Sequence, residues 1–203
     1  MNKKSLAVAL SRLRPLLNYE RNIEQYSIDS ENAAMILWDA YLHGDIKGDA
    51  VDLGCGNGIL GIGSLLLGAS KCYFVDIDSN AIKIARENLD RLNLNGEFFI
   101  QDVSSFNKKC HIVFMNPPFG VQRIHADKAF LEQAFKISKI VYSIHKIESI
   151  GFLRQISKDN GFKMLRVIEF DFIIKRVMKS HKKEKYIVKV GCFVFHKVEK
   201  RKL

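Results

Sequence analysis

The sequence of 203 residues is poor in proline and has no long apolar run. With three prolines and no low-complexity tract, it gives little sign of long linkers or disorder. No stretch reaches the roughly 18 apolar residues that a membrane-spanning helix needs. Near the start of the chain, Arg12 and Arg14 break an apolar run that is already too short for a signal peptide. We therefore expect no membrane partner and a cytoplasmic location.

Cysteine is also scarce, and its spacing argues against two common roles. The four cysteines form no Cys-x-x-Cys pair, and no cysteines and histidines share the spacing of a metal site. They are Cys55, Cys72, Cys110 and Cys192. Neither a disulfide framework nor a metal site is expected, and a reducing compartment is the simpler interpretation.

Acidic residues are few near the C-terminal end, where most of the net charge of +10 lies. From Lys175 to Leu203 there are eleven Lys and Arg against Glu184 and Glu199, a balance of +9. Apolar residues interleave with these charges, which a plain solubilising tail would not need. Nucleic-acid phosphates are the natural partner of such a segment, and a solvated tail is the alternative.

The rest of the chain has the composition of a globular protein and alternates strand-like with helix-like segments. Strands are predicted at residues 49–53, 71–75, 97–100, 111–115 and 140–144. Helices are predicted at 59–67, at 79–92 with Ser79 as N-cap, at 127–138 and at 147–158. Two further strands, 163–174 and 186–198, follow with no helix between them, separated by a basic segment expected to be exposed.

This alternation predicts an α/β fold with a doubly wound, mostly parallel sheet and an antiparallel C-terminal edge pair. Leucines at helical spacing, Leu6, Leu10, Leu13 and Leu17, predict that one or two N-terminal helices precede the sheet. We expect one domain over residues 1–203, with a helical cap over 1–48 and the core over 49–203.

The most informative motif is Asn116-Pro117-Pro118-Phe119, which follows the predicted strand 111–115. Open α/β sheets bind ligands at the carboxyl ends of their strands. The amide oxygen of Asn116 and the carbonyl of Pro117 can each accept one hydrogen of a planar amine. Phe119 can stack on the ring that carries that amine. A Pro-Pro turn without a ligand is the plain structural alternative.

A glycine-rich turn, which includes Gly54 and Gly56, connects the first core strand to its helix. Its glycines let a ligand approach the backbone, and with Asp76 the turn also matches a dinucleotide fingerprint. Aspartates at three successive strand ends instead suit a cationic ligand, S-adenosylmethionine. Asp52 could face its amino group, Asp76 its ribose hydroxyls and Asp102 its adenine amine. Each aspartate could also be a helix cap or turn residue.

These motifs, in this order and spacing, resemble the class I S-adenosylmethionine-dependent methyltransferases over residues 49–145. The Asn-Pro-Pro-Phe form marks members that methylate a planar amine of adenine, guanine or glutamine. Three further segments, Glu24-Gln-Tyr26, Tyr142-Ser-Ile-His-Lys146 and Ser180-His-Lys-Lys183, extend the resemblance over nearly the whole chain. They resemble the methyltransferase-like 5 family, which methylates N6 of one adenosine in small-subunit ribosomal RNA.

The resemblance assigns expected roles to individual residues. The catalytic set that holds the flipped base is Asn116, Pro117, Pro118 and Phe119. The set expected to hold S-adenosylmethionine is Gln25, Tyr26, Asp52, Gly54, Gly56, Asp76, Asp102, Val103 and Asn116. The set expected near RNA is His145, Lys146, His181, Lys182, Lys183 and Lys185. The family usually continues its Glu-Gln-Tyr with Pro-Thr, whereas this chain has Ser27-Ile28 and so no hydroxyl at position 28.

The expected function is therefore methyl transfer from S-adenosylmethionine to N6 of a flipped adenosine, in small-subunit rRNA. Eukaryotic members of the family work with a small zinc-binding activator protein that adds to the sheet edge. Three alternatives stay open: a guanine-N2 rRNA methyltransferase, a protein-glutamine methyltransferase and a non-catalytic RNA-binding protein. Glutamine enzymes usually carry Tyr after the two prolines, and the intact Asp52, Asp76 and Asn116 weigh against a non-catalytic protein.

Overall fold

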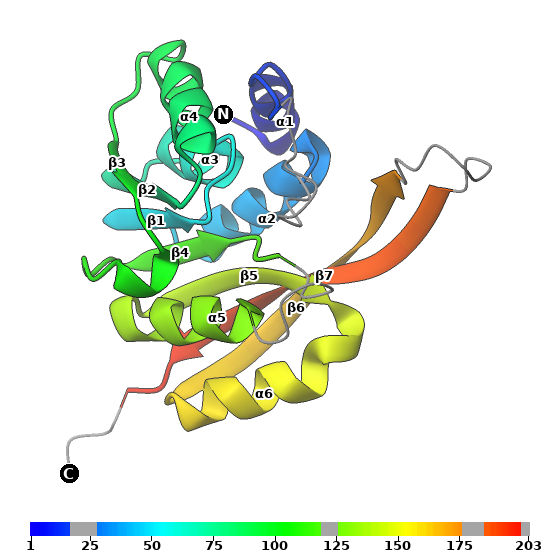
Figure 1. The fold of residues 1–203 in the computed structure, drawn as a ribbon. Coiled ribbons are helices and arrows are strands. Elements are labelled where there is room, and N and C mark those ends of the chain that lie inside the picture. The colour runs from blue at the N-terminus through cyan, green and yellow to red at the C-terminus, as the bar shows by residue number, and fades with distance from the viewer. Residues whose placement is uncertain (17–27, 119–125, 176–184, 200–203) are drawn as a thin grey trace.

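The computed structural model describes residues 1–16, 28–118, 126–175 and 185–199 (Figure 1). Within them, a seven-stranded sheet has the strand order β3-β2-β1-β4-β5-β7-β6. Five strands run parallel, and β7 and β6 complete one edge as antiparallel strands. The predicted α/β class and doubly wound sheet are confirmed.

The strand bounds lie close to the predicted ones. The parallel strands are β1 (Asp49–Leu53), β2 (Lys71–Asp76), β3 (Glu97–Ile100), β4 (Ile112–Met115) and β5 (Ile140–Lys146). The edge pair is β6 (Phe162–Lys175) and β7 (Lys185–Lys197). The fifth strand runs two residues further than predicted, because antiparallel pairing with β7 continues to Lys146 opposite Val190.

Six α-helices flank the described sheet. They are α1 (Lys3–Ser11), α2 (Ser30–Leu42), α3 (Ile59–Leu66), α4 (Ser79–Asp90), α5 (Ala126–Ile137) and α6 (Ile150–Asp159). The prediction that Ser79 caps the fourth helix is wrong by one position, since Asp78 is the N-cap and accepts from the N–H of Asn80 at 2.8 Å. The predicted helix 147–158 begins instead with a 3-10 turn over Ile147–Ser149.

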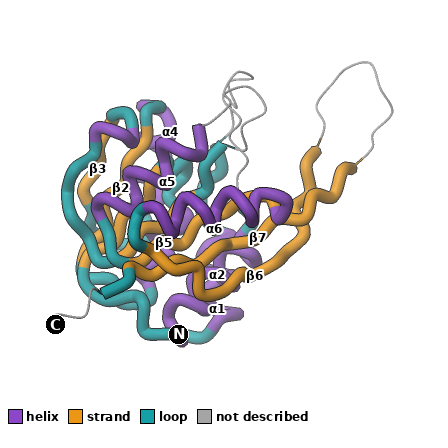
Figure 2. Tube along the Cα trace, turned by 90° about the horizontal axis from the view of Figure 1, so that it is seen from below, coloured by secondary structure: helices purple, strands orange, loops and turns teal. Residues whose placement is uncertain are grey.

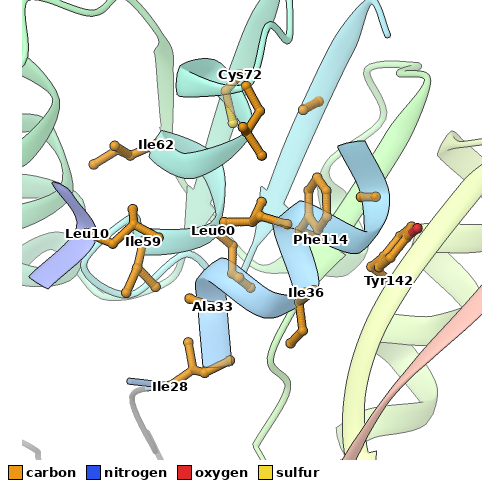
Figure 3. Close-up of a cluster of buried hydrophobic side chains, with 14 of the residues drawn as sticks. Leu10, Ile28, Ala33, Ile36, Ile59, Leu60, Ile62, Cys72, Phe114 and Tyr142 are labelled. Atoms are coloured by element: carbon orange, nitrogen blue, oxygen red, sulfur yellow. The ribbon is translucent and has the colours of Figure 1, made fainter. Parts of the chain in front are cut away.

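Two apolar clusters cover the two faces of the sheet. One gathers helices α1 to α4 against side chains such as Phe74 and Phe114. Figure 3 shows part of this cluster, with Phe114 labelled. The other gathers α5 and α6 against neighbours such as Val75 and Val113. Adjacent strand residues thus point to opposite, equally buried faces, which explains the continuous apolar runs of these strands. The helices leave the carboxyl ends of the parallel strands as the place where loops can form a site.

A polar network ties α2 and the loop after it to the antiparallel edge. The guanidinium of Arg166 on β6 donates to the carboxylate of Asp39 at 2.7 Å. Tyr142 donates to Asp45 at 2.8 Å, and His196 lies 3.2 Å from the same carboxylate. Because Asp45 is 4% exposed, these partners replace the water that its carboxylate loses on folding. The network fixes the N-terminal helices against the edge pair.

The edge pair extends beyond the rest of the sheet. β5 ends opposite Val190, whereas β6 and β7 stay paired out to Lys175 opposite Lys185. Figures 1 and 2 show this two-stranded ribbon projecting away from the body. The basic segment predicted to be exposed begins at its end, and residues 176–184 lie outside the described residues.

Candidate functional site

The glycine-rich turn follows β1 and is held by hydrogen bonds to the end of β2. The N–H groups of Gly54 and Cys55 donate to the carbonyl of Val75 at 2.8 and 2.9 Å. The N–H of Gly56 donates to Asp76 Oδ2 at 2.9 Å. Gly54 and Gly56 have positive φ of 74° and 54°, so residues other than glycine would strain the turn.

This geometry counts against the dinucleotide alternative. A pyrophosphate is bound by unoccupied backbone N–H groups at a helix N-terminus. Here the N–H groups of Gly54, Cys55 and Gly56 already have partners, and that of Gly58 donates to the carbonyl of Cys55 at 2.8 Å. The buried carboxylate of Asp76, beside the turn, would also repel a dianion. The donor and charge pattern favours a cationic ligand.

Asp52 takes a position that differs from the expectation. Its carboxylate is 2% exposed and accepts the N–H of Gly61 at 2.8 Å, under the first turn of α3. Burial raises its pKa to about 8, and the nearby charge of Asp76 adds to the rise. Through Oδ2 the carboxyl group supports the start of α3, and contact of Asp52 with the cofactor stays a prediction.

Asp76 lies at the end of β2, beside the turn. Its two carboxylate oxygens accept from the N–H groups of Gly56 and Asp78 at 2.9 and 3.0 Å, and burial raises its pKa. The next residue, Ile77, is 59% exposed. An exposed apolar residue next to the carboxylate that is expected to bind the ribose suits an adenine ring, and the sequence analysis did not predict it. In the sequence, Ile77 is marked only by its position between Asp76 and Asp78.

Asp102 follows β3 and is exposed. It is the N-cap of a 3-10 turn and accepts from the N–H and hydroxyl of Ser104 at 2.8 and 2.6 Å. The turn-capping role that the sequence allowed is therefore present, and Val103 behind it is buried. Contact of Asp102 with an adenine amine stays a prediction.

The Asn-Pro-Pro motif follows β4 directly, as predicted. The side-chain oxygen of Asn116 is buried, Pro117 is buried and Pro118 is partly buried. Leu53 of β1 and Met115 of β4 are register partners, so Gly54 and Asn116 leave neighbouring strands at the same level. The predicted cofactor turn and the predicted amine-binding motif are therefore neighbours. Phe119 lies outside the described residues.

Two further side chains pack on the turn and were not predicted. A Cβ on Gly54 would lie 2.8 Å from Cε1 of Phe130, so this ring of α5 covers the turn closely. A Cβ on Gly56 would lie 3.5 Å from Cδ1 of Leu16, which is itself buried. Both contacts join segments distant in sequence, which no local pattern marks.

The expected RNA-contacting residues divide into three groups. His145 is 3% exposed, and its Nε2 lies 2.5 Å from Ser143 Oγ; burial lowers its pKa to about 3. A neutral imidazole carries no charge to attract a phosphate, and contact of His145 with RNA stays a prediction. Lys146 ends β5 and is half-buried, and Lys185 begins β7 on the ribbon. His181, Lys182 and Lys183 lie outside the described residues, as do Gln25 and Tyr26.

The described part of the chain contains no helix long and apolar enough to cross a membrane. It also contains no group of three or more His, Cys, Asp or Glu that could hold a metal ion. The site combines glycine backbone, carboxylates and the Asn-Pro-Pro segment. These residues fit S-adenosylmethionine, because Asp76 and Asp102 carry acceptors for hydroxyl and amine groups and the turn has the close backbone packing that only Gly54 and Gly56 allow.

Comparison with known proteins identifies the family. The methyltransferase small domain family matches residues 26–140. An rRNA N(6)-adenosine-methyltransferase METTL5 of Danio rerio is 34% identical over 85% of this chain and 88% of its own length. The crystal structure of a candidate RNA methyltransferase from Pyrococcus horikoshii superimposes with a TM-score of 0.90 at 41% identity, covering 98% and 99% of the two chains.

A more distant structure shares the fold. Magnesium protoporphyrin IX methyltransferase from Synechocystis, solved with bound S-adenosylmethionine, superimposes with a TM-score of 0.65 at 15% identity, covering 98% of both chains. The chain therefore belongs to the methyltransferase small domain family and, within it, to methyltransferase-like 5, and it is an S-adenosylmethionine-dependent methyltransferase.

Proposed function

We propose that this enzyme methylates N6 of an adenosine in RNA, with small-subunit rRNA in the cytoplasm as the substrate. The observation that carries the proposal is the register of β1 and β4. It brings Asn116-Pro117 next to the glycine-rich turn, because Leu53 pairs with Met115. A planar amine bound by Asn116 and Pro117 would then lie close to the cofactor.

The chemistry needs little acid–base help from the protein. When bound, S-adenosylmethionine supplies an electrophilic methyl group on a positively charged sulfur. The exocyclic nitrogen of adenine is a weak nucleophile, because its lone pair is delocalised into the ring. We propose that the amide oxygen of Asn116 and the carbonyl of Pro117 accept the two amine hydrogens and draw the nitrogen toward tetrahedral geometry.

The transfer step is then a direct in-line displacement. The amine nitrogen forms a bond to the methyl carbon as the carbon–sulfur bond breaks, and the bond electrons remain on sulfur. The methylated amine becomes acidic and releases its extra proton, so no strong base is required. Positioning and electrostatics therefore provide most of the rate acceleration.

RNA as the substrate class rests on charge and on the relatives. The segment from Lys175 to Leu203 carries a net charge of +9. It starts at the last residue of β6 and includes β7. Lys189 is exposed on the ribbon, opposite Asp171. A base must leave its stack to reach a site at the strand ends, as other base-modifying enzymes require. We propose that Lys182, Lys183 and Lys185 bind RNA phosphates.

The experiment that tests the proposal identifies the methylated nucleoside. Purified enzyme and labelled S-adenosylmethionine are incubated with unmodified small-subunit rRNA, and the RNA is digested to nucleosides for chromatography. Label in N6-methyladenosine supports the proposal, and label in a guanosine derivative assigns the chain to guanine-N2 methylation. Label in protein glutamine, from a parallel incubation with ribosomal proteins, would contradict an RNA substrate.

An activator protein is a separate question for the same assay. The family resemblance implies a small zinc-binding partner that adds to a sheet edge, and in the described sheet β3 and β6 are the edge strands. If cofactor binds but no RNA is labelled, the assay is repeated with such a partner. Labelling only in its presence would assign the chain to the activator-dependent members. Failure of the protein to bind cofactor would instead favour a non-catalytic RNA-binding protein.

A further inference from the structure

A fully buried amide joins the glycine-rich turn to the N-terminal segment. Asn88 lies in α4, is 0% exposed and is the one polar residue among the buried residues of this helix. Its Oδ1 accepts the backbone N–H of Arg14 at 2.7 Å. Its Nδ2 donates to the carbonyls of Arg14 and Asn57, each at 3.0 Å. One side chain thus connects three segments that are distant in sequence.

The bonds to residue 14 are directed to the backbone and not to the guanidinium. The Asn88 amide pairs with both the N–H and the carbonyl of Arg14, as a neighbouring strand would. Asn57 Nδ2 adds a weaker bond to the same carbonyl at 3.3 Å. The Arg14 guanidinium separately lies 2.5 Å from Glu87, with side chains 40% and 33% exposed. The exposed ion pair contributes little by comparison.

The docked segment reaches the turn within two residues. Leu16 is 7% exposed, and its Cδ1 lies 3.5 Å from the place where a Gly56 Cβ would be. Arg14 to Leu16 therefore lies against the backbone that is expected to carry the cofactor. A polar side chain with no exposure, in a helix otherwise buried through Ala and Leu, costs free energy unless its hydrogen bonds are made.

The turn needs hydrogen bonds from other segments, because glycine has little intrinsic preference between positive and negative φ. Gly56 and Gly58, on either side of Asn57, have φ of 54° and 83°, values that glycine adopts about as readily as negative ones. Hydrogen bonds must therefore select the conformation. The bond from Asn88 to the Asn57 carbonyl fixes the residue between these two glycines.

We propose that Asn88 is a positioning residue of the cofactor site, which holds the glycine-rich turn and the Arg14–Leu16 segment together in the binding-competent conformation. Asn88 does not touch the cofactor in this account. Its removal lowers the fraction of molecules whose turn is ready to bind, and the apparent dissociation constant rises by the inverse of that fraction. The effect requires only cofactor binding and is independent of which nucleotide is methylated.

The test measures the Kd of S-adenosylmethionine by titration calorimetry, in the absence of RNA, on folded protein well below its unfolding temperature. Asn88→Ala is expected to raise Kd about tenfold, as a fall of the competent fraction to about one tenth would do. Two neighbours on α4 serve as matched controls. Glu87→Ala removes the ion pair with Arg14, and Leu89→Ala destabilises the core; both are expected to change Kd by less than about twofold.

A second variant tests whether Asn88 influences cofactor binding through the Arg14–Leu16 segment. Leu16→Ala removes the contact with Gly56 and is also expected to weaken binding. If Asn88 acts by docking this segment, the double variant binds no worse than Asn88→Ala alone, because the two changes break one connection. Independent, multiplying effects on Kd would overturn that route.

A purely structural role gives a different result. Asn88→Ala would then lower the unfolding temperature, as Leu89→Ala does, while its Kd stays equal to that of the parent enzyme; this outcome overturns the proposal. Should Asn88→Ala fail to fold, Leu16→Ala alone decides: a raised Kd supports the proposal and an unchanged Kd overturns it.

Discussion

The carboxylate of Asp52 and the backbone N–H of Gly61 form a hydrogen bond of 2.8 Å beneath the first turn of α3. Asp52 is 2% exposed, and burial raises its pKa from 3.8 to about 8. In the cofactor-free enzyme, Asp52 is therefore neutral at pH values between 3.8 and about 8, where an exposed aspartate is ionised. The residue that begins the glycine motif is thus also a source of pH-dependent stability.

The first prediction concerns that pH dependence. Between pH 3.8 and about 8, folded protein keeps a proton on Asp52 that the unfolded chain has released. The contribution of Asp52 to stability is therefore full below pH 3.8 and is lost as the pH rises through about 8. Asp52→Asn, which cannot ionise, should gain unfolding temperature relative to the parent as pH rises from about 5 to about 8. Thermal unfolding of cofactor-free protein measures the difference.

The comparison contains its own control. Both proteins share every other titrating group, so the difference between the two profiles reports the ionisation of Asp52 and its coupling to neighbours such as Asp76. A difference in unfolding temperature that stays constant with pH would mean that the carboxyl group keeps its ordinary pKa.

The second prediction contrasts two glycines at helix starts. A Cβ on Gly61 would meet Cys72 Sγ at 2.8 Å and Asp52 Cβ at 3.0 Å, so Gly61→Ala should lower the free energy of unfolding by about 1–3 kcal/mol. A Cβ on Gly151, in the first turn of α6, has nothing within 4 Å. Gly151→Ala should therefore stabilise by up to about 1 kcal/mol, since alanine favours helix.

Denaturant unfolding checks the pair. If both substitutions change the free energy of unfolding equally, the close contacts around Gly61 do not decide whether a side chain fits there. S-adenosylmethionine binding by the Gly151→Ala variant provides the reference for an intact site.

Much of this fold is predictable because local pattern and burial agree. The strand Asp49–Leu53 has its predicted bounds, because its apolar side chains suit a strand buried on both faces and the glycine-rich turn marks its end. The edge pair follows from two strands without a helix between them. Asp78 rather than Ser79 caps α4, because either side chain can accept the free N–H groups and only the backbone geometry decides.

The candidate site is less predictable, because its supporting contacts are not local. The motif residues Gly54, Gly56, Asp76 and Asn116 come together because their strands are neighbours in the sheet. Sequence reasoning does not give the direction of the Asp52 carboxylate, which depends on the position of α3. It also does not reveal the bond between Asn88 and Arg14, which spans 74 positions.

The third prediction concerns the basic residues between β6 and β7 and at the start of β7. Replacing Lys182, Lys183 and Lys185 with alanine should weaken RNA binding and reduce the slope of log K against log salt by about 0.7 for each lost phosphate contact. Binding of a small-subunit rRNA fragment, measured at several salt concentrations, gives the slope. The matched control replaces the exposed residues Lys3, Lys4 and Lys83, which lie on α1 and α4. If both triple variants keep the parent slope, the C-terminal lysines serve solubility rather than RNA.

The most direct test of the account compares the parent enzyme with Asn116→Ala at saturating S-adenosylmethionine. Formation of N6-methyladenosine in small-subunit rRNA is followed in a single turnover, and cofactor affinity is measured beside it. We predict that the variant binds cofactor and loses about 10²-fold or more in rate, because one acceptor for the amine is gone. A near-normal rate with cofactor bound would contradict the role assigned to Asn116 and, with it, the proposed mechanism.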